Sequence, residues 1–139
     1  MRTFLAIILL SLCNPSFASV SESRAKQIYQ KLLRATGVRP LALVVKAGVC
    51  SLACTNGRQI FISRELLRIV RNEDELAGVI GHEMAHAKYS SELKADVLGL
   101  KYAKQAGYSY CRAAQILKGL EKDTNHPGGS TRYKNTGCK

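Results

Sequence analysis

The sequence predicts one α+β domain that is mostly helical, with a small antiparallel β-sheet beside a central helix. Its 139 residues suffice for one domain and are too few for two. Five stretches carry apolar residues at helical spacing behind a capping residue, and two short aliphatic runs stand on either side of the turn pair Asn56-Gly57. An apolar content of 46% and a charged content of 22% are typical of a chain that folds around a core, which excludes a mainly disordered protein.

The first residues have the pattern of an export signal. Arg2 precedes an apolar run over residues 4–12, and Ser16-Phe17-Ala18 places small residues at the first and third positions before a cleavage point. We interpret residues 1–18 as a secretory signal peptide. Residues 19–139 then form the exported domain, which we expect to be periplasmic or secreted and without a transmembrane segment.

Two other interpretations of this N-terminal segment are less favoured. The apolar run is shorter than the roughly 20 residues that span a bilayer, which argues against a membrane anchor. A lipoprotein attached through Cys13 would need a small residue before the cysteine, and Leu12 stands there instead.

The exported domain opens with a helix predicted from Ser19 to about Thr36. Ser19 and Glu22 have the spacing of a capping box, and Gly37 follows where a helix often ends. The apolar stripe that supports this helix consists of Ile28, Tyr29, Leu32 and Leu33.

Two extended segments follow, at residues 41–45 and 59–63. Both are short and rich in aliphatic or β-branched residues. The irregular stretch between them ends in Asn56-Gly57, a strong signal for a turn between antiparallel strands. We therefore expect a small antiparallel sheet here.

Two helices are predicted next. Ser63 caps a short one that extends through Val70. Asn72 and Glu75 form a capping box for the second, which ends near Tyr89 and is the central helix of the domain.

A serine also caps each of two later helices, predicted over residues 92–105 and from Ser109 through Leu120. Gly107 closes the first of them. After Lys122 the chain is polar and rich in glycine without helical spacing, so we expect no regular element there.

The central helix carries the stretch His82-Glu83-Met84-Ala85-His86. A helix turns about 100° per residue, so two histidines four apart lie on one face, one above the other. This spacing suits two ligands of one zinc ion, and Glu83 is placed to act as general base on a water at that ion. An isolated histidine pair would fit a merely polar helix face as well, and the glutamate in register favours the metal site.

A catalytic zinc site needs a third protein ligand, and Glu92 is the best placed candidate. It lies in the first turn of the next helix, after a connection so short that the chain must fold back past His86. Asp96, four residues later on the same helix face, can accept a hydrogen bond from the second nitrogen of a ligating histidine. A solvated helix face is the alternative for both carboxylates.

Further stretches around these residues complete a known pattern: residues 57–67, residues 72–81, Gly99, and His126-Pro127 followed by Arg132. Together with the two motifs above they resemble the zinc metallopeptidase family that contains the HtpX-like heat-shock proteases and the CAAX prenyl endopeptidases. The resemblance implies a zincin-like metalloprotease domain with one zinc ion. It also implies that His126 and Arg132 face the active site, where they would stabilise the oxyanion.

The chain departs from this family pattern in one respect. Only five residues separate His86 from Glu92, where the family usually has a longer and sometimes membrane-spanning segment. We therefore expect a compact, minimal version with an open cleft.

Four cysteines remain after removal of the signal peptide: Cys50, Cys54, Cys111 and Cys138. An even number in an exported domain predicts disulfides, although the sequence alone permits three pairings. The alternative is a zinc site built from these cysteines, but Cys111 and Cys138 have no nearby cysteine or histidine to complete a ligand pair. We favour Cys111 with Cys138, which would fasten the glycine-rich tail, and therefore Cys50 with Cys54.

The charge balance is strongly basic. Removal of residues 1–18 takes away one of the 21 Lys and Arg residues and none of the 10 acidic ones, which leaves a formal charge of +10. Such a surplus permits peripheral contact with an anionic cell envelope. No tight basic cluster with interleaved aromatic residues is present, so we expect no nucleic-acid partner.

These observations predict a zinc-dependent endopeptidase that hydrolyses polypeptide substrates among exported or envelope proteins. The alternative is a zinc-stabilised envelope binding or chaperone-like module without proteolysis. Glu83 argues for catalysis, because a purely structural zinc needs no base beside it.

Overall fold

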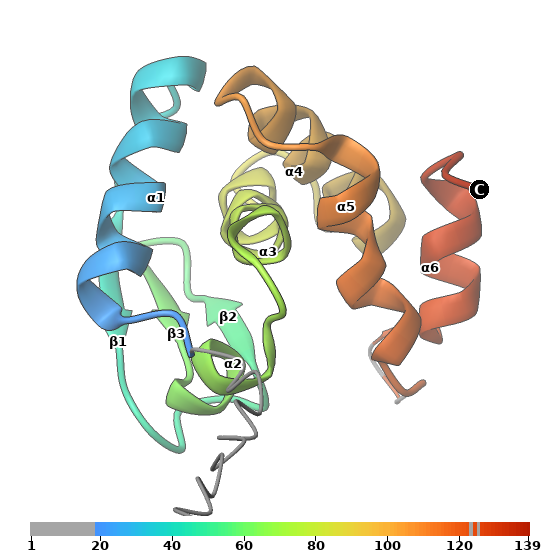
Figure 1. The fold of residues 1–139 in the computed structure, drawn as a ribbon, viewed down its shortest axis with the longest axis horizontal. Coiled ribbons are helices and arrows are strands. Elements are labelled where there is room, and N and C mark those ends of the chain that lie inside the picture. The colour runs from blue at the N-terminus through green and yellow to red at the C-terminus, as the bar shows by residue number, and fades with distance from the viewer. Residues whose placement is uncertain (1–18, 123, 125) are drawn as a thin grey trace, which may run out of the picture.

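The structure, a computed structural model, describes residues 19–122, 124 and 126–139 (Figure 1). The predicted signal peptide lies outside these described residues. In chain order the elements are α1 (Glu22–Thr36), β1 (Ala42–Val45), β2 (Ala53–Thr55), β3 (Gln59–Ile62), α2 (Arg64–Ile69), α3 (Glu73–Ala85), α4 (Glu92–Gln105), α5 (Tyr110–Ala114), the 3₁₀ helix η1 (Gln115–Gly119) and α6 (Gly129–Asn135).

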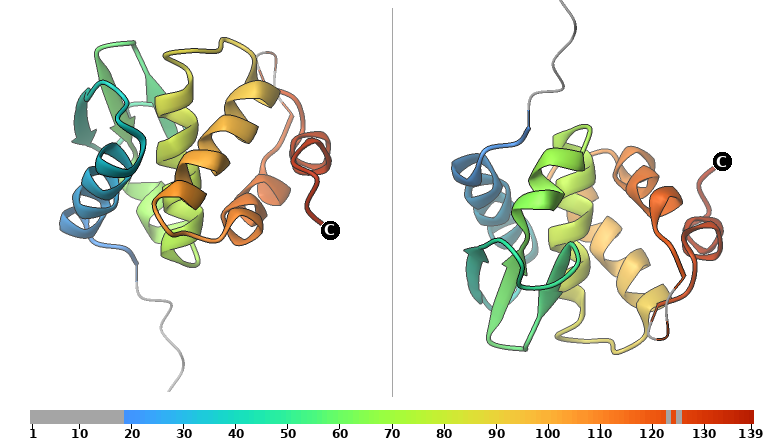
Figure 2. Two further views of the ribbon diagram at one scale, coloured as in Figure 1. Left: turned by 90° about the horizontal axis from the view of Figure 1, so that it is seen from above. Right: turned by 90° about the horizontal axis from the view of Figure 1, so that it is seen from below.

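Helix α3 lies at the centre of the molecule. Helix α1 packs on one side of it and α4 and α5 pack on the other, while the sheet lies below α1 and α3 (Figures 1 and 2). Helix α6 lies outermost, against η1 and α4. The predicted α+β class, with a small sheet beside the central helix, is confirmed. Within the part of the chain that is described, no helix is both long and apolar enough to cross a membrane.

The sheet is mixed, and not purely antiparallel as the sequence predicted. Its order is β1-β3-β2, with β2 antiparallel and β1 parallel to β3. The predicted turn is present, because the Asn56 side chain accepts hydrogen bonds from the backbone N–H groups of Arg58 and Gln59. The prediction failed on direction because the irregular stretch before this turn holds the extra strand β2, which reverses the chain once more.

Two apolar clusters form the core. The larger one fills the space between α1, the sheet, α2 and α3, and its fully buried side chains include Ile28, Leu32, Ile60, Ile62, Leu66, Leu76 and Ile80. The smaller one lies under α5, η1 and α6 and consists of Leu100, Ala113, Ala114, Leu117 and Tyr133. Because α3 and α4 separate the two clusters, both helices are buried on more than one face.

Most predicted helix starts are confirmed. Ser63, Asn72, Ser91 and Ser109 each accept a hydrogen bond from a backbone N–H in the first turn of their helix. The exception is α1, whose N-cap is Ser21 and not Ser19, because the Ser21 hydroxyl accepts from the Arg24 N–H at 3.1 Å.

Helix ends differ more from the predictions. Helix α3 stops at Ala85 with His86 as its C-cap, four residues before the predicted end near Tyr89. The predicted last helix, from Ser109 through Leu120, is divided into α5 and η1.

Helix α6 was not predicted at all. Its N-cap, Gly128, has no side chain to accept a hydrogen bond, and Tyr133 supplies the only buried apolar side chain of the helix. The helix is fastened by contacts beyond its own sequence, among them the backbone hydrogen bond from Gly129 N to Leu120 O at 3.0 Å. Periodicity could not reveal an element held in this way.

Both favoured disulfides are confirmed. Cys50 pairs with Cys54, with their Cα atoms 6.3 Å apart, and Cys111 pairs with Cys138 at 5.6 Å. The second bond joins α5 to the segment after α6.

The two disulfides should contribute unequally to stability. Constraint of the unfolded chain grows with loop length, so replacing Cys111 and Cys138 by serine should lower the free energy of unfolding by about 3–4 kcal/mol. Replacing Cys50 and Cys54, which are only four residues apart, should lower it by about 2 kcal/mol. Urea unfolding of both double variants measures the difference, and the reverse order would contradict this assignment.

Candidate metal centre

Helix α3 brings two histidines of the predicted site together. His82 and His86 lie one turn apart, with their Nε2 atoms 3.0 Å from each other and their rings nearly perpendicular. Both side chains are partly buried. Two imidazole nitrogens that face each other this closely would share a hydrogen or a metal ion.

The third predicted ligand, Glu92, enters from the first turn of α4. Its Oε2 lies 3.3 Å from Nε2 of His82, and its Oε1 lies 3.3 Å from Nε2 of His86. Oε2 is buried, and within the described part of the chain no donor is aligned to hydrogen-bond it.

This donor set fits a zinc ion. Ligand atoms at 2.0–2.1 Å in a tetrahedron are about 3.3 Å apart from one another. The two Nε2 atoms are 3.0 Å apart, and each lies 3.3 Å from a different oxygen of the Glu92 carboxylate. With one ligand atom from each side chain, His82, His86 and Glu92 form a group within 4.8 Å that could hold a metal. Two nitrogens and one carboxylate oxygen also match the ligand types of catalytic zinc sites.

The other nitrogen of each histidine faces a proton acceptor. Nδ1 of His86 lies 2.9 Å from the carbonyl oxygen of Tyr89, and Nδ1 of His82 lies 2.9 Å from Oδ1 of Asp96. An acceptor at Nδ1 favours a proton there, which leaves the lone pair of a neutral imidazole on Nε2. Asp96 therefore lies beside Nδ1 of His82, and the Tyr89 carbonyl is a partner of His86 that the sequence did not indicate.

Arg132 reaches the same cluster from α6. Its guanidinium donates two hydrogen bonds to Asp96, at 2.8 and 2.7 Å, and Nη2 lies 3.4 Å from Oε2 of Glu92. The side chain is buried, so this two-pronged contact is shielded from water. The family resemblance predicts Arg132 at the oxyanion, whereas in the structure its guanidinium contacts the carboxylates of Asp96 and Glu92.

His126 lies at the open side of the cluster. Its Nε2 is 3.8 Å from Oε1 of Glu92, and 44% of its side chain is exposed. This position brings the predicted residue to the site while keeping it accessible from solvent.

The protonation equilibria show where positive charge is favoured. Burial opposes a charge on His82, yet the carboxylates of Asp96 and Glu92 raise the pKa of its imidazole to about 9. Burial also opposes a charge on Glu92, yet the adjacent imidazoles hold the pKa of its carboxyl well below the usual range. The space between these side chains therefore favours a cation.

Glu83 lies beside this space and is almost fully buried. Burial raises the pKa of its carboxyl, and the charges of His82 and His86 oppose that rise. A carboxylate with a raised pKa is a stronger base than an exposed one, as proton abstraction from water requires.

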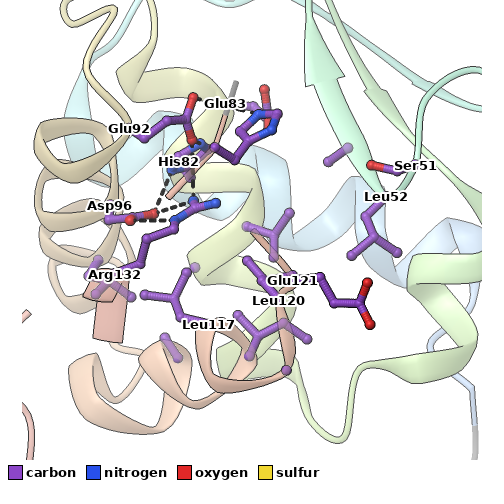
Figure 3. Close-up of a pocket in the computed structure, with 18 of the residues that line it drawn as sticks. Ser51, Leu52, His82, Glu83, Glu92, Asp96, Leu117, Leu120, Glu121 and Arg132 are labelled. Carbon is purple, nitrogen blue, oxygen red and sulfur yellow. Dashed lines mark hydrogen bonds and ion pairs between the residues drawn. The ribbon is translucent and has the colours of Figure 1, made fainter. Parts of the chain in front are cut away.

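A cavity of about 390 Å³ opens next to the cluster (Figure 3). Its polar end is lined by His82, Glu83, Glu92, His126 and Arg132. Its apolar part is lined by Leu52, Ala53, Val79, Leu100, Ile116, Leu117 and Leu120. These residues come from β2 and its preceding loop, from α3 and α4, and from η1 and the residue after it, so no single stretch of the sequence indicated this wall.

A comparison with known protein families finds one match. The family model for peptidase family M48 matches residues 22–90, a segment that runs from α1 through α3 and contains His82, Glu83 and His86. No curated protein and no solved structure matches the chain. The match stops just before Glu92, so the later site residues rest on geometry. The chain belongs to peptidase family M48, a family of metallopeptidases.

Proposed function

We propose that this chain is a zinc-dependent endopeptidase that hydrolyses peptide bonds in exported or envelope proteins. The observation that supports this most directly is the convergence of His82, His86 and Glu92 on one point, with Glu83 beside it at the polar end of a cavity. Membership of a metallopeptidase family gives this geometry its reaction class.

In this proposal His82, His86 and Glu92 hold one zinc ion. Three protein ligands leave a coordination position for water, as in catalytic zinc sites. A zinc ion bound there supplies Lewis-acid chemistry, which acidifies water and polarises a carbonyl group.

Glu83 is the general base. Its carboxylate takes a proton from the attacking water and later returns it to the amine that leaves. A buried carboxylate with a raised pKa holds that proton more readily than an exposed one.

His126 is the proposed hydrogen-bond donor to the oxyanion. Its imidazole is exposed at the cavity mouth and can donate a hydrogen bond to the developing oxyanion. Arg132 and Asp96 act on the substrate only through the metal ligands, since they fix His82 and Glu92 in place.

The proposed location is an oxidising compartment outside the cytoplasm. Two disulfides close loops in the domain, and such bonds persist in exported proteins. The proposed substrates are polypeptides, and the formal surplus of positive charge suits contact with an anionic envelope.

Replacing a metal ligand should remove metal and activity together. His86→Ala deletes one of the two nitrogens, so the purified protein should lose its single zinc ion and its cleavage of an unfolded protein. His126→Ala is the matched control, because it should keep full zinc occupancy while turnover falls. Elemental analysis measures the zinc content of both variants, and a cleavage assay measures their turnover. Full zinc occupancy in His86→Ala would reject the ligand assignment.

Replacing the base should separate metal from activity. Glu83→Gln keeps the shape of the side chain but cannot accept a proton, so the hydrolysis rate should fall by about 10²–10⁴-fold with zinc retained. Glu65→Gln, on an exposed part of α2, is the control and should cleave at the wild-type rate. If Glu83→Gln cleaved as fast as the wild type, the binding or chaperone-like module would replace the peptidase.

Replacing the carboxylate beside His82 should weaken metal binding without abolishing it. Asp96→Asn removes the charge next to Nδ1 of His82 and one partner of Arg132, so zinc affinity should fall by about 10–100-fold. Asp74 contacts Arg112 and Ser109 at the far end of α3, so Asp74→Asn should leave the zinc affinity unchanged. Competition with a zinc-binding dye measures the affinity, and equal affinities in the two variants would show that Asp96 does not support the site.

A further inference from the structure

Three consecutive residues of the cavity wall lie between two bonded cysteines. Ser51, Leu52 and Ala53 all line the cavity, and Cys50 and Cys54 close the loop that contains them. We propose that the Cys50–Cys54 disulfide is a positioning element for the substrate, which holds Leu52 as one wall of an apolar subsite beside the metal centre. This inference rests on the proposed peptidase function and names the class of side chain that the site accepts.

Besides the packing of Leu52 and Ala53 against the larger apolar cluster, the loop has few hydrogen bonds that hold it. Strand β2 has only three residues and pairs with β3 alone among the described strands, so it forms one edge of the sheet. Before the strand, the carbonyl of Leu52 accepts a hydrogen bond from the N–H of Ser63 at 2.8 Å. A short edge segment with these few hydrogen bonds has low local stability, so a covalent link across it restricts its motion substantially.

The opposite wall comes from η1 and the residue after it. Figure 3 shows Leu52 on one side of the cavity and Leu117 and Leu120 on the other. Val79, which lies about one turn before His82 on α3, also lines the cavity. An aliphatic or aromatic substrate side chain would bury apolar surface against these residues, whereas alanine would leave the subsite unfilled.

The second disulfide provides a matched comparison. Cys111 and Cys138 join α5 to the C-terminal segment, and their loop contains Leu117 and Leu120 of the opposite wall. These two leucines also pack in the smaller apolar cluster, so that wall has a support besides the disulfide. The Cys111–Cys138 bond closes a longer loop, so its loss should destabilise the protein more than loss of Cys50–Cys54. If both bonds acted only on stability, loss of Cys111–Cys138 would therefore change peptide binding at least as much as loss of Cys50–Cys54.

The test measures peptide binding in the Glu83→Gln background, where bound peptide is not consumed. The zinc-loaded protein is titrated with two peptides, which differ only by leucine or alanine at the residue after the scissile bond. The leucine peptide should bind at least about tenfold more tightly than the alanine peptide. Adding C50S and C54S should reduce this preference to about twofold or less, whereas adding C111S and C138S should leave it in place.

Leu52→Ala tests the same subsite with both disulfides intact, so it decides the question even if the C50S and C54S variant folds poorly. It should reduce the leucine preference, while Ile69→Ala, an exposed apolar residue of α2 outside the cavity, should not. A preference kept in Leu52→Ala, or lost equally in both disulfide variants, would overturn the proposal.

The wild-type protein is assayed with the leucine peptide in parallel. Peptide bound but never cleaved would overturn the peptidase function and not this subsite.

Discussion

The close approach of α3 and α4 is the constraint on which the rest of the site depends. Gly81 and Gly99 face each other where the two helices cross, and a Cβ atom on either would collide with the backbone of the opposite helix. Only glycines allow this contact. It sets the distance from which Glu92 and Asp96 of one helix reach His82 of the other, so the ligand geometry is determined by backbone packing before any side chain is placed.

The second requirement is charge compensation in a buried place. Glu83, Asp96 and Arg132 are all buried, and burial of unpaired charges is costly. Arg132 neutralises Asp96 and approaches Glu92, so both carboxylates can remain ionised although they are largely shielded from water. A cation between His82, His86 and Glu92 would complete this balance. The arginine is therefore better understood as part of the frame of the site than as a group that touches substrate.

Local signals predicted what local interactions determine. Helix starts with a serine or asparagine cap, the one-face spacing of His82 and His86, and the turn at Asn56-Gly57 all depend on residues within four positions of one another. The errors lie where distant contacts decide. The parallel pairing of β1 with β3 depends on an inserted strand, and α6 depends on η1 and on a disulfide. The wall from Ser51 to Ala53 joins the site only through the tertiary fold.

The C-terminal segment is where stability and chemistry meet. Its sequence has no helical stripe, yet α6 must be placed accurately enough for Arg132 to make two hydrogen bonds with Asp96 across 36 positions of sequence. Tyr133, the next residue, packs into the smaller apolar cluster, and Cys138 ties the end of the chain to α5. Helix α5 in turn packs on α3, the helix that carries both histidines. The Cys111–Cys138 bond is therefore connected through packed helices to the candidate ligands His82 and His86. A tail with little intrinsic helical preference can thus deliver a buried charge, since its order is supplied by the elements that it contacts.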